Sequence, residues 1–150
     1  MNFDKFTIKA QEVVQEAANG AQRGGQQTIE PIHFLRAMIE KAQDVAGFPL
    51  PKQRVNVQHT AQATESEISH LPRVSGGNGQ SYLSNDANQV VMRAEALAQE
   101  MGDEYVSVET FFLALLDVNS TASRILKDAG LTKQNVTAAI RELRQGKNVK

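Results

Sequence analysis

The 150-residue sequence contains no cysteine and no tryptophan, few aromatic residues, and almost no net charge. Without cysteine, thiolate catalysis, cysteine-bound zinc and disulfide bridges are excluded, which fits a reducing compartment. Sixteen basic residues balance seventeen acidic ones, which argues against nucleic-acid binding. No run approaches the roughly 20 apolar residues of a membrane span, and the polar start lacks a signal-peptide core. We therefore expect a cytoplasmic protein with a largely aliphatic core that contacts neither nucleic acid nor membranes.

The motifs of common enzyme classes are also absent. The sequence has no G-x-x-x-x-G-K-[ST] phosphate loop, no G-x-S-x-G nucleophile turn and no H-E-x-x-H metal motif. The glycines of residues 76–79 resemble a phosphate loop only in composition, so a flexible linker is the better interpretation. His33 begins an apolar helix face, which favours a hydrogen-bonded structural role, whereas His59 and His70 are too far apart to share a metal. We predict that this chain is not an enzyme and holds neither a metal nor a cofactor.

What the sequence has instead is an internal duplication. Residues 10–37 align with residues 87–114 at a constant offset of 77, and nine of the aligned pairs are identical. A second block, residues 50–55, returns as residues 131–136. The identical pairs include Val13 and Val90, Gly25 and Gly102, and Phe34 and Phe111. The duplication predicts two halves of similar structure.

Apolar residues recur at helical spacing in the segments between turn signals, and no strand pattern is present. The residues suited to cap these helices are Thr7, Ser84, Ser107 and Thr132. The glycines suited to end them are Gly24 with Gly25, Gly102, Gly130 and Gly146. The pattern predicts an all-α fold of about eight helices, formed by two four-helix repeats related by a pseudo-two-fold axis. We expect repeat one at 5–72, a linker at 73–83, repeat two at 84–146 and the start of a further linker at 147–150.

Four segments resemble the amino-terminal domain of the ClpB disaggregases, a branch of the Clp AAA+ chaperone family. They are residues 1–12 (MNFDKFTIKAQE), 29–33 (IEPIH), 70–77 (HLPRVSGG) and 100–107 (EMGDEYVS). The resemblance implies the double Clp repeat fold, placed on a mobile linker above a homo-hexameric ring of ATPase modules. It also implies that the domain engages unfolded or aggregated polypeptides and helps to pass them to the pore. ATP, magnesium and cooperation with a DnaK-type chaperone system would belong to other parts of that longer protein.

The resemblance further implies which residues bind protein. Thr7, Asp103 and Glu109 match polar positions that matter for chaperone activity in the family, and Val91 and Leu97 match one wall of an apolar groove between the repeats. The ordinary interpretations are a helix N-cap for Thr7 and stabilisation of a helix start for Glu109. Whether the two apolar residues face a groove or the core stays open at this point, because both surfaces use one apolar stripe.

This sequence departs from the family pattern at three positions. Arg93 and Thr110 stand where related domains often carry leucine, so we expect a less apolar groove rim, along which the arginine can still lay its aliphatic stem. The related ClpC branch holds phosphoarginine with a glutamate in each repeat. Here the first of these is Ile32 and only Glu109 remains, so phosphoarginine recognition is not expected.

Client binding is the function that these observations favour, and two other classes remain as alternatives. The domain could dock a folded adaptor, in which case one tight complex forms without competition from unfolded chains. It could also be purely structural, in which case its removal leaves disaggregation unchanged. An enzymatic role is the most remote of the hypotheses.

Overall fold

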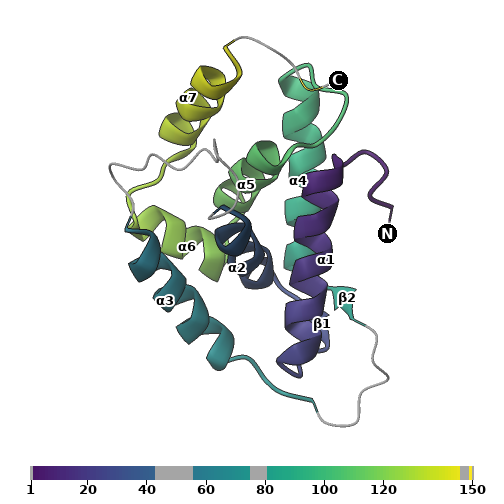
Figure 1. Ribbon diagram of the computed structural model, residues 1–150, viewed down its shortest axis with the longest axis vertical. Helices are drawn as coiled ribbons and strands as arrows, with labels where there is room; N and C mark the ends of the chain where they lie inside the picture. The colour runs from purple at the N-terminus through teal and green to yellow at the C-terminus, as the bar shows by residue number, and fades with distance from the viewer. Residues whose placement is uncertain (1, 43–55, 75–80, 146–148, 150) are drawn as a thin grey trace.

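The computed structural model describes residues 2–42, 56–74, 81–145 and 149 (Figure 1). Within these ranges the chain forms seven helices and two strands of two residues each. The helices are α1 (Ile8–Arg23), α2 (Pro31–Ala42), α3 (Val57–Ser69), α4 (Asn85–Glu100), α5 (Val108–Asp117), α6 (Thr121–Asp128) and α7 (Lys133–Arg144). The strands are β1 (Thr28–Ile29) and β2 (Tyr82–Leu83). The predicted all-α class is confirmed, and the eighth helix that we expected lies outside the described residues if it falls between 43 and 55.

The helices α1 and α4 are built from the duplicated segment and begin and end in the same way. Thr7 and Ser84, 77 residues apart, accept the amide hydrogens of the residues three positions later, each at 3.1 Å. Such N-caps satisfy donors that the first turn leaves without a partner. At the other end, Gly25 and Gly102 both adopt φ of 75°, a backbone conformation that favours glycine. The predicted duplication is therefore visible in the backbone conformation itself.

Short extended segments connect the two halves crosswise, although the sequence showed no strand pattern. In the parallel pair of β1 and β2, Ile29 lies opposite Leu83, and in an isolated bridge Phe6 lies opposite Val106. Each residue of the first pair is 77 positions from a residue of the second. The segment before α4 thus pairs with the first half, and the segment before α1 pairs with the second half. This exchange of segments between the halves is the pseudo-two-fold relation in structural terms. The sequence contains no sign of these strands, because one or two paired residues are too few to form an alternating apolar and polar pattern.

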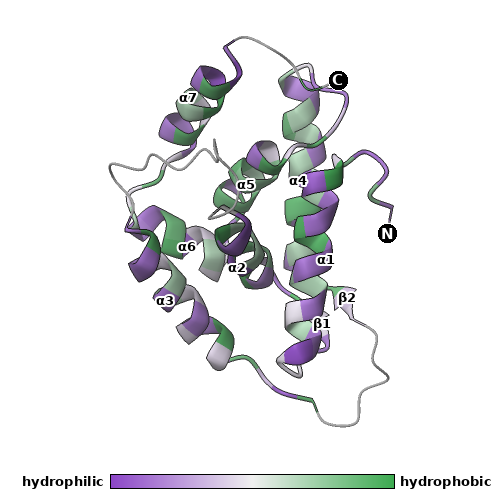
Figure 2. Cartoon of the chain, viewed as in Figure 1, coloured by the Kyte–Doolittle hydropathy of each residue, from purple (hydrophilic) through white to green (hydrophobic). Residues whose placement is uncertain are grey.

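The centre of the core is formed by α2 and α5, which pack against each other and against most other helices. Figure 2 shows α5 as a mainly hydrophobic helix, in keeping with its run of buried side chains. Phe34 of α2 and Phe111 of α5 are duplicates of one another, and their rings meet edge to face with centroids 4.9 Å apart. Phe6 joins the same cluster, with its ring centroid 5.3 Å from that of Phe111. The core is mostly aliphatic, as expected, but an aromatic contact lies at the seam between the halves.

The last helix ends earlier than the sequence pattern indicated. Thr132 caps α7 as predicted, and its side chain accepts the amide of Asn135 at 3.0 Å. The helix stops at Arg144, where Gln145 takes the left-handed conformation with φ of 50° that we had assigned to Gly146. Throughout the described ranges, each helix is too short or too polar to cross a membrane.

Candidate functional site

The polar residues of the second half converge on one arginine. Arg144, the last residue of α7, inserts its guanidinium between the loop that follows α4 and the first turn of α5. Its Nη1 donates to Asp103 Oδ2 at 2.7 Å. Its Nη2 lies within bonding distance of three further oxygens, those of Ser107 (2.9 Å), Thr110 (3.2 Å) and Glu109 (3.4 Å). We call Arg144 and these four partners the arginine clamp.

Local structure places each partner in the arginine clamp. Asp103 follows the left-handed Gly102, and its amide donates to Ala98 O at 2.9 Å, which fixes the loop as it leaves α4. Ser107 is the N-cap of α5, and Glu109 and Thr110 lie in the first turn of that helix. Three acceptors therefore come from one helix start, where negative charge is also favoured by the helix dipole.

The clamp is largely withdrawn from water. The Arg144 side chain is 10% exposed and that of Asp103 is fully buried. Within the described residues, the Arg144 Nε is a buried donor without a hydrogen-bond partner. Removing one member of such a pair leaves an uncompensated buried charge, which is strongly destabilising.

A second contact brings the C-terminal segment to the same loop. Val149 donates its amide to Asp103 Oδ1 at 2.9 Å and accepts the amide hydrogen of Glu104 at 2.9 Å. Both carboxylate oxygens of Asp103 are thus occupied by groups of this chain, one by the Arg144 guanidinium and one by a backbone amide.

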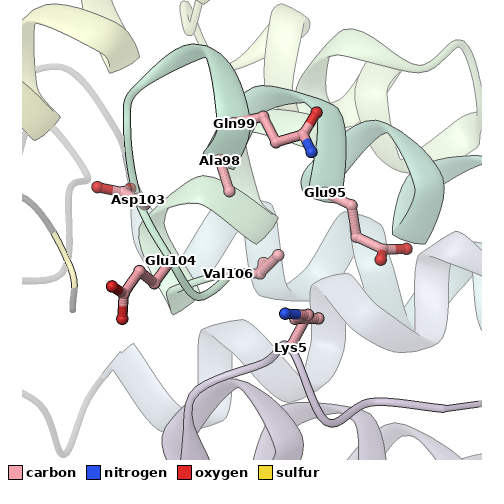
Figure 3. Close-up of a pocket in the computed structure, with 7 residues that line it drawn as sticks. All are labelled: Lys5, Glu95, Ala98, Gln99, Asp103, Glu104 and Val106. Carbon is pink, nitrogen blue, oxygen red and sulfur yellow. The ribbon is translucent and has the colours of Figure 1, made fainter.

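A small cavity of about 210 Å³ lies beside this loop, at the seam between the halves. Ala98 and Val106 contribute apolar surface to it, and the remaining lining residues are polar or charged. Figure 3 shows Glu95 and Gln99 projecting from α4, whereas Lys5 approaches from the N-terminal segment on the other side. This volume is below the 300–1,000 Å³ range that is typical of sites for whole small molecules, and a single side chain is a better match.

Thr7 reaches the same seam from the first half. Its hydroxyl caps α1 by accepting the amide of Ala10, as predicted, and its own amide donates to Val106 O at 2.9 Å. The neighbouring Lys5 accepts the amide hydrogen of Val106 at 2.7 Å and lines the cavity. Thr7, Asp103 and Glu109 are therefore grouped around the loop at residues 103–107 and the first turn of α5 that follows it.

The sequence left open whether Val91 and Leu97 face a groove or the core, and in the structure both lie in the core. Their side chains are 1% and 2% exposed and belong to the continuous hydrophobic core. The physical reason is that α4 directs its apolar stripe towards α5, so the residues of this stripe are covered by the neighbouring helix. Thr110 is likewise fully buried, so it lies inside the arginine clamp and not at a groove rim.

Arg93, which we expected at a groove rim, is exposed but does not line the cavity. Its side chain is 44% exposed and its Nε donates to Asp117 Oδ2 at 2.7 Å, which links α4 to the end of α5. Lys133 lies 3.6 Å from the same carboxylate oxygen. Exposed pairs of this kind contribute little stability, and this contact holds the arginine stem along the surface.

His33 has the hydrogen-bonded structural role that we predicted. Its Nδ1 accepts the amide hydrogen of Glu30 at 2.9 Å, and its Nε2 lies 3.3 Å from Gln26 Oε1. The Nδ1 contact reproduces at the start of α2 the reverse bond of a capping box. Burial of the ring and the neighbouring Arg36 charge lower the pKa of His33 to about 4. In the duplicated position of the second half stands Thr110, so both halves bury a polar residue here.

Comparison with known proteins adds to this geometry. Residues 5–129 match the family model described as "Clp repeat (R) N-terminal domain". The chain belongs to this Clp N-terminal domain family. It is 48% identical over 149 residues to the chaperone protein ClpB of Bacteroides thetaiotaomicron and 44% identical to that of Porphyromonas gingivalis. These alignments cover 99% of the chain but only 17% of each relative, so the chain corresponds to a minor part of their length.

Solved structures agree with this family assignment at the level of the fold. The N-terminal domain of Hsp104 from Candida albicans superimposes with a TM-score of 0.84, covering 98% of the chain and 96% of that domain, at 23% identity. The N-terminal domain of ClpD from Arabidopsis thaliana superimposes with a TM-score of 0.70, also at 23% identity. The arrangement of α1 to α7 is therefore that of a Clp N-terminal domain.

Sequence reasoning missed Arg144, the centre of the arginine clamp. In the last helix the apolar residues at helical spacing are Val136, Ile140 and Leu143, but Leu143 is 45% exposed. Steps of four from the two buried residues lead to position 144, which would have put the arginine on the inner face. A charged residue near a helix end is usually exposed to solvent. Only the contacts of Arg144 with its partners on α5 show that its side chain is buried.

Proposed function

We propose that this Clp N-terminal domain is the client-engaging part of a longer ATP-dependent disaggregase. In this proposal it binds exposed apolar segments of unfolded or aggregated polypeptides and assists their transfer to the pore of a homo-hexamer. The observation that carries the proposal is the cavity at the seam of the two halves, in a chain whose relatives are ClpB chaperones. Residues from both halves line it, which is where the resemblance implied a groove.

The chemistry of this cavity suits weak and unselective capture. Ala98 and Val106, which are 4% and 1% exposed, supply only a little apolar surface within a mostly polar lining, so at most one side chain of an extended polypeptide can be accommodated, without a specific sequence. Apolar contact is non-directional and scales with buried area. A contact of a few hundred Å² at about 25 cal/mol per Å², less the cost of ordering the client, gives at best micromolar-scale affinity. Six copies on one ring would raise the effective affinity through multivalency.

The other parts of the proposed protein would supply the energy-dependent steps. The chain itself has no phosphate-loop motif, so ATP and magnesium would bind to ATPase modules elsewhere in the longer chaperone. Contact with a DnaK-type chaperone system would also involve other domains, and the location would be cytoplasmic. We expect the pure 150-residue chain to turn over no nucleotide.

An NMR titration with a reduced and alkylated protein that stays unfolded tests this proposal. We expect amide shifts at Ala98, Gln99 and Val106. Gln99→Phe should fill the cavity and weaken binding at least about tenfold, or about 1.4 kcal/mol. The matched control is Glu100→Phe, since Glu100 is exposed at the next position of α4 but does not line the cavity. Shifts confined to the face formed by α3 and α6 would contradict the proposal.

A folded adaptor would give a different result in the same experiment. It would form one tight complex that the unfolded chain does not displace. A purely structural domain would show no shifts at any client concentration.

A further inference from the structure

The arginine clamp engages the two carboxylates that sequence comparison would assign to client binding. We propose that Asp103 and Glu109 act as positioning residues, which hold Arg144 and Val149 against the loop at residues 103–107 and the first turn of α5. The groups that these two carboxylates hold are the chain's own Arg144 and Val149. Three features of the structure support this role.

The first observation is that both carboxylate oxygens of Asp103 accept hydrogen bonds from groups of this chain. Arg144 occupies Oδ2 at 2.7 Å and the Val149 amide occupies Oδ1 at 2.9 Å, and the side chain is fully buried. A client could reach this carboxylate only after the chain's own groups had left it. In the clamped structure both oxygens of this carboxylate are therefore engaged within the chain.

The second observation comes from the duplicated half, which has the same backbone without the clamp. The positions 77 residues before Asp103 and Thr110 are Gln26 and His33, whose side chains approach each other at 3.3 Å. The position equivalent to Glu109 is Ile32, which is buried. The repeat scaffold therefore closes with neutral hydrogen bonds, and the ionic clamp is an addition in the half where the C-terminal segment arrives.

The third observation is the geometry of the arginine and its neighbour. The guanidinium lies near oxygens of Asp103, Ser107, Glu109 and Thr110 at once, a fork arrangement that lysine cannot reproduce. The chain then turns through Gln145 in the left-handed region, which is uncommon for a residue other than glycine. Buried polar groups of this kind can select one arrangement over its alternatives, at some cost in stability.

The clamp thus holds the end of α7 and Val149 on the loop beside the seam cavity. Asp103 both accepts from Arg144 and lines that cavity, so the C-terminal segment and the cavity share one residue. In the longer chaperone proposed above, on which this consequence rests, the clamp would set the direction in which the chain leaves the domain.

Amide hydrogen exchange of the 150-residue chain tests the clamp directly. The informative amides are those of Glu104 and Val149, because they donate to Val149 O and Asp103 Oδ1. Arg144→Gln should accelerate exchange at both amides at least about tenfold, and Arg144→Lys should restore protection only in part. The matched control is Arg141→Gln, which removes an exposed charge from the same last turn of α7 and should change neither amide.

Client affinity separates this proposal from the function proposed above. If the clamp is correct, Asp103→Asn and Arg144→Gln should release the two amides to the same degree. The double variant should then add nothing, and Arg144→Gln, at a residue that does not line the cavity, should change affinity for the unfolded client by less than about twofold. Unchanged exchange in Arg144→Gln would overturn the clamp. So would unchanged exchange in Asp103→Asn, because the carboxylate would then not hold Val149. If the unmodified chain binds no client at all, the function proposed above fails while the exchange result still decides the clamp.

Discussion

At the scale of single residues, the environment of a side chain determines its role more than its type does. Leu97 and Met92 are both apolar residues of α4, yet the first is 2% exposed and the second 60%. Arg141 and Arg144 are both basic residues in the last turn of α7, yet only the second is buried among acceptors. Residue type predicted neither difference, because the face of a helix that is covered depends on its neighbours.

Truncating Leu97 should destabilise the domain and not simply reduce binding. We expect Leu97→Ala to lower the free energy of unfolding by about 2–5 kcal/mol, because it opens a cavity in a packed core. A glutamate would be tolerated at a position that faces a groove. Because Leu97 is buried in the core, Leu97→Glu should instead unfold the domain. Met92→Ala is the matched control on the same helix and should change stability by less than about 0.5 kcal/mol. Chemical denaturation of the three variants measures this, and a folded Leu97→Glu protein would restore the groove interpretation.

His33 should make stability depend on pH in a defined window. Its pKa is about 4 in the folded state because of burial and the charge of Arg36, and about 6.5 in an unfolded chain. The unfolded state therefore gains a proton first on acidification. The contribution of the neutral ring is fully present above about pH 6.5 and is lost as the pH falls towards 4, by up to about 3 kcal/mol.

Urea unfolding between pH 4 and 8 measures this contribution. His33→Gln keeps a polar side chain but cannot titrate, so the difference between the two proteins isolates the histidine from the carboxylates. Parallel pH profiles for the two proteins would contradict the prediction.

At the scale of elements, local signals predicted helix starts well. The predicted caps Thr7, Ser84, Ser107 and Thr132 all accept an amide hydrogen of their own helix. These bonds span three residues, so no tertiary information is needed to foresee them. The strands β1 and β2 were not foreseen, because each is only two residues long and its partner belongs to the other half.

Equivalent caps in the two halves should have equivalent energies. Thr7→Ala and Ser84→Ala each remove the oxygen that accepts an amide hydrogen at 3.1 Å, and we expect each to lower stability by about 1 kcal/mol. Thr7→Ser retains the oxygen and should cost much less. Thermal unfolding followed by circular dichroism measures the three variants. A loss of stability in Thr7→Ser equal to that in Thr7→Ala would show that the methyl group matters and the cap does not.

At the scale of the whole molecule, the two halves form one core. Phe34 and Phe111 meet across the seam, and the segments at Phe6 and Leu83 each pair with the opposite half. The central helices α2 and α5 also contact each other. Each half therefore covers apolar surface that the other would expose to water.

The two halves should consequently fail to fold alone. If the chain is cut between Asn78 and Gly79, we expect neither piece by itself to show a cooperative thermal transition. Mixing the pieces should restore one, with the near-ultraviolet signal of packed aromatic rings. A cooperative transition in the first piece alone would mean that its own helices suffice for a core.

The duplication, the four predicted helix caps and the family follow from the sequence alone, because each is carried by residues close together in the chain or by whole-segment likeness. Thr7, Asp103 and Glu109 were also found in this way, but as three separate positions. That they surround one loop, that Leu97 is buried and that Arg144 joins two carboxylates all depend on contacts between segments distant in the sequence. Such contacts form only when the helices pack, since packing determines which face of each helix is covered and which charges are brought together.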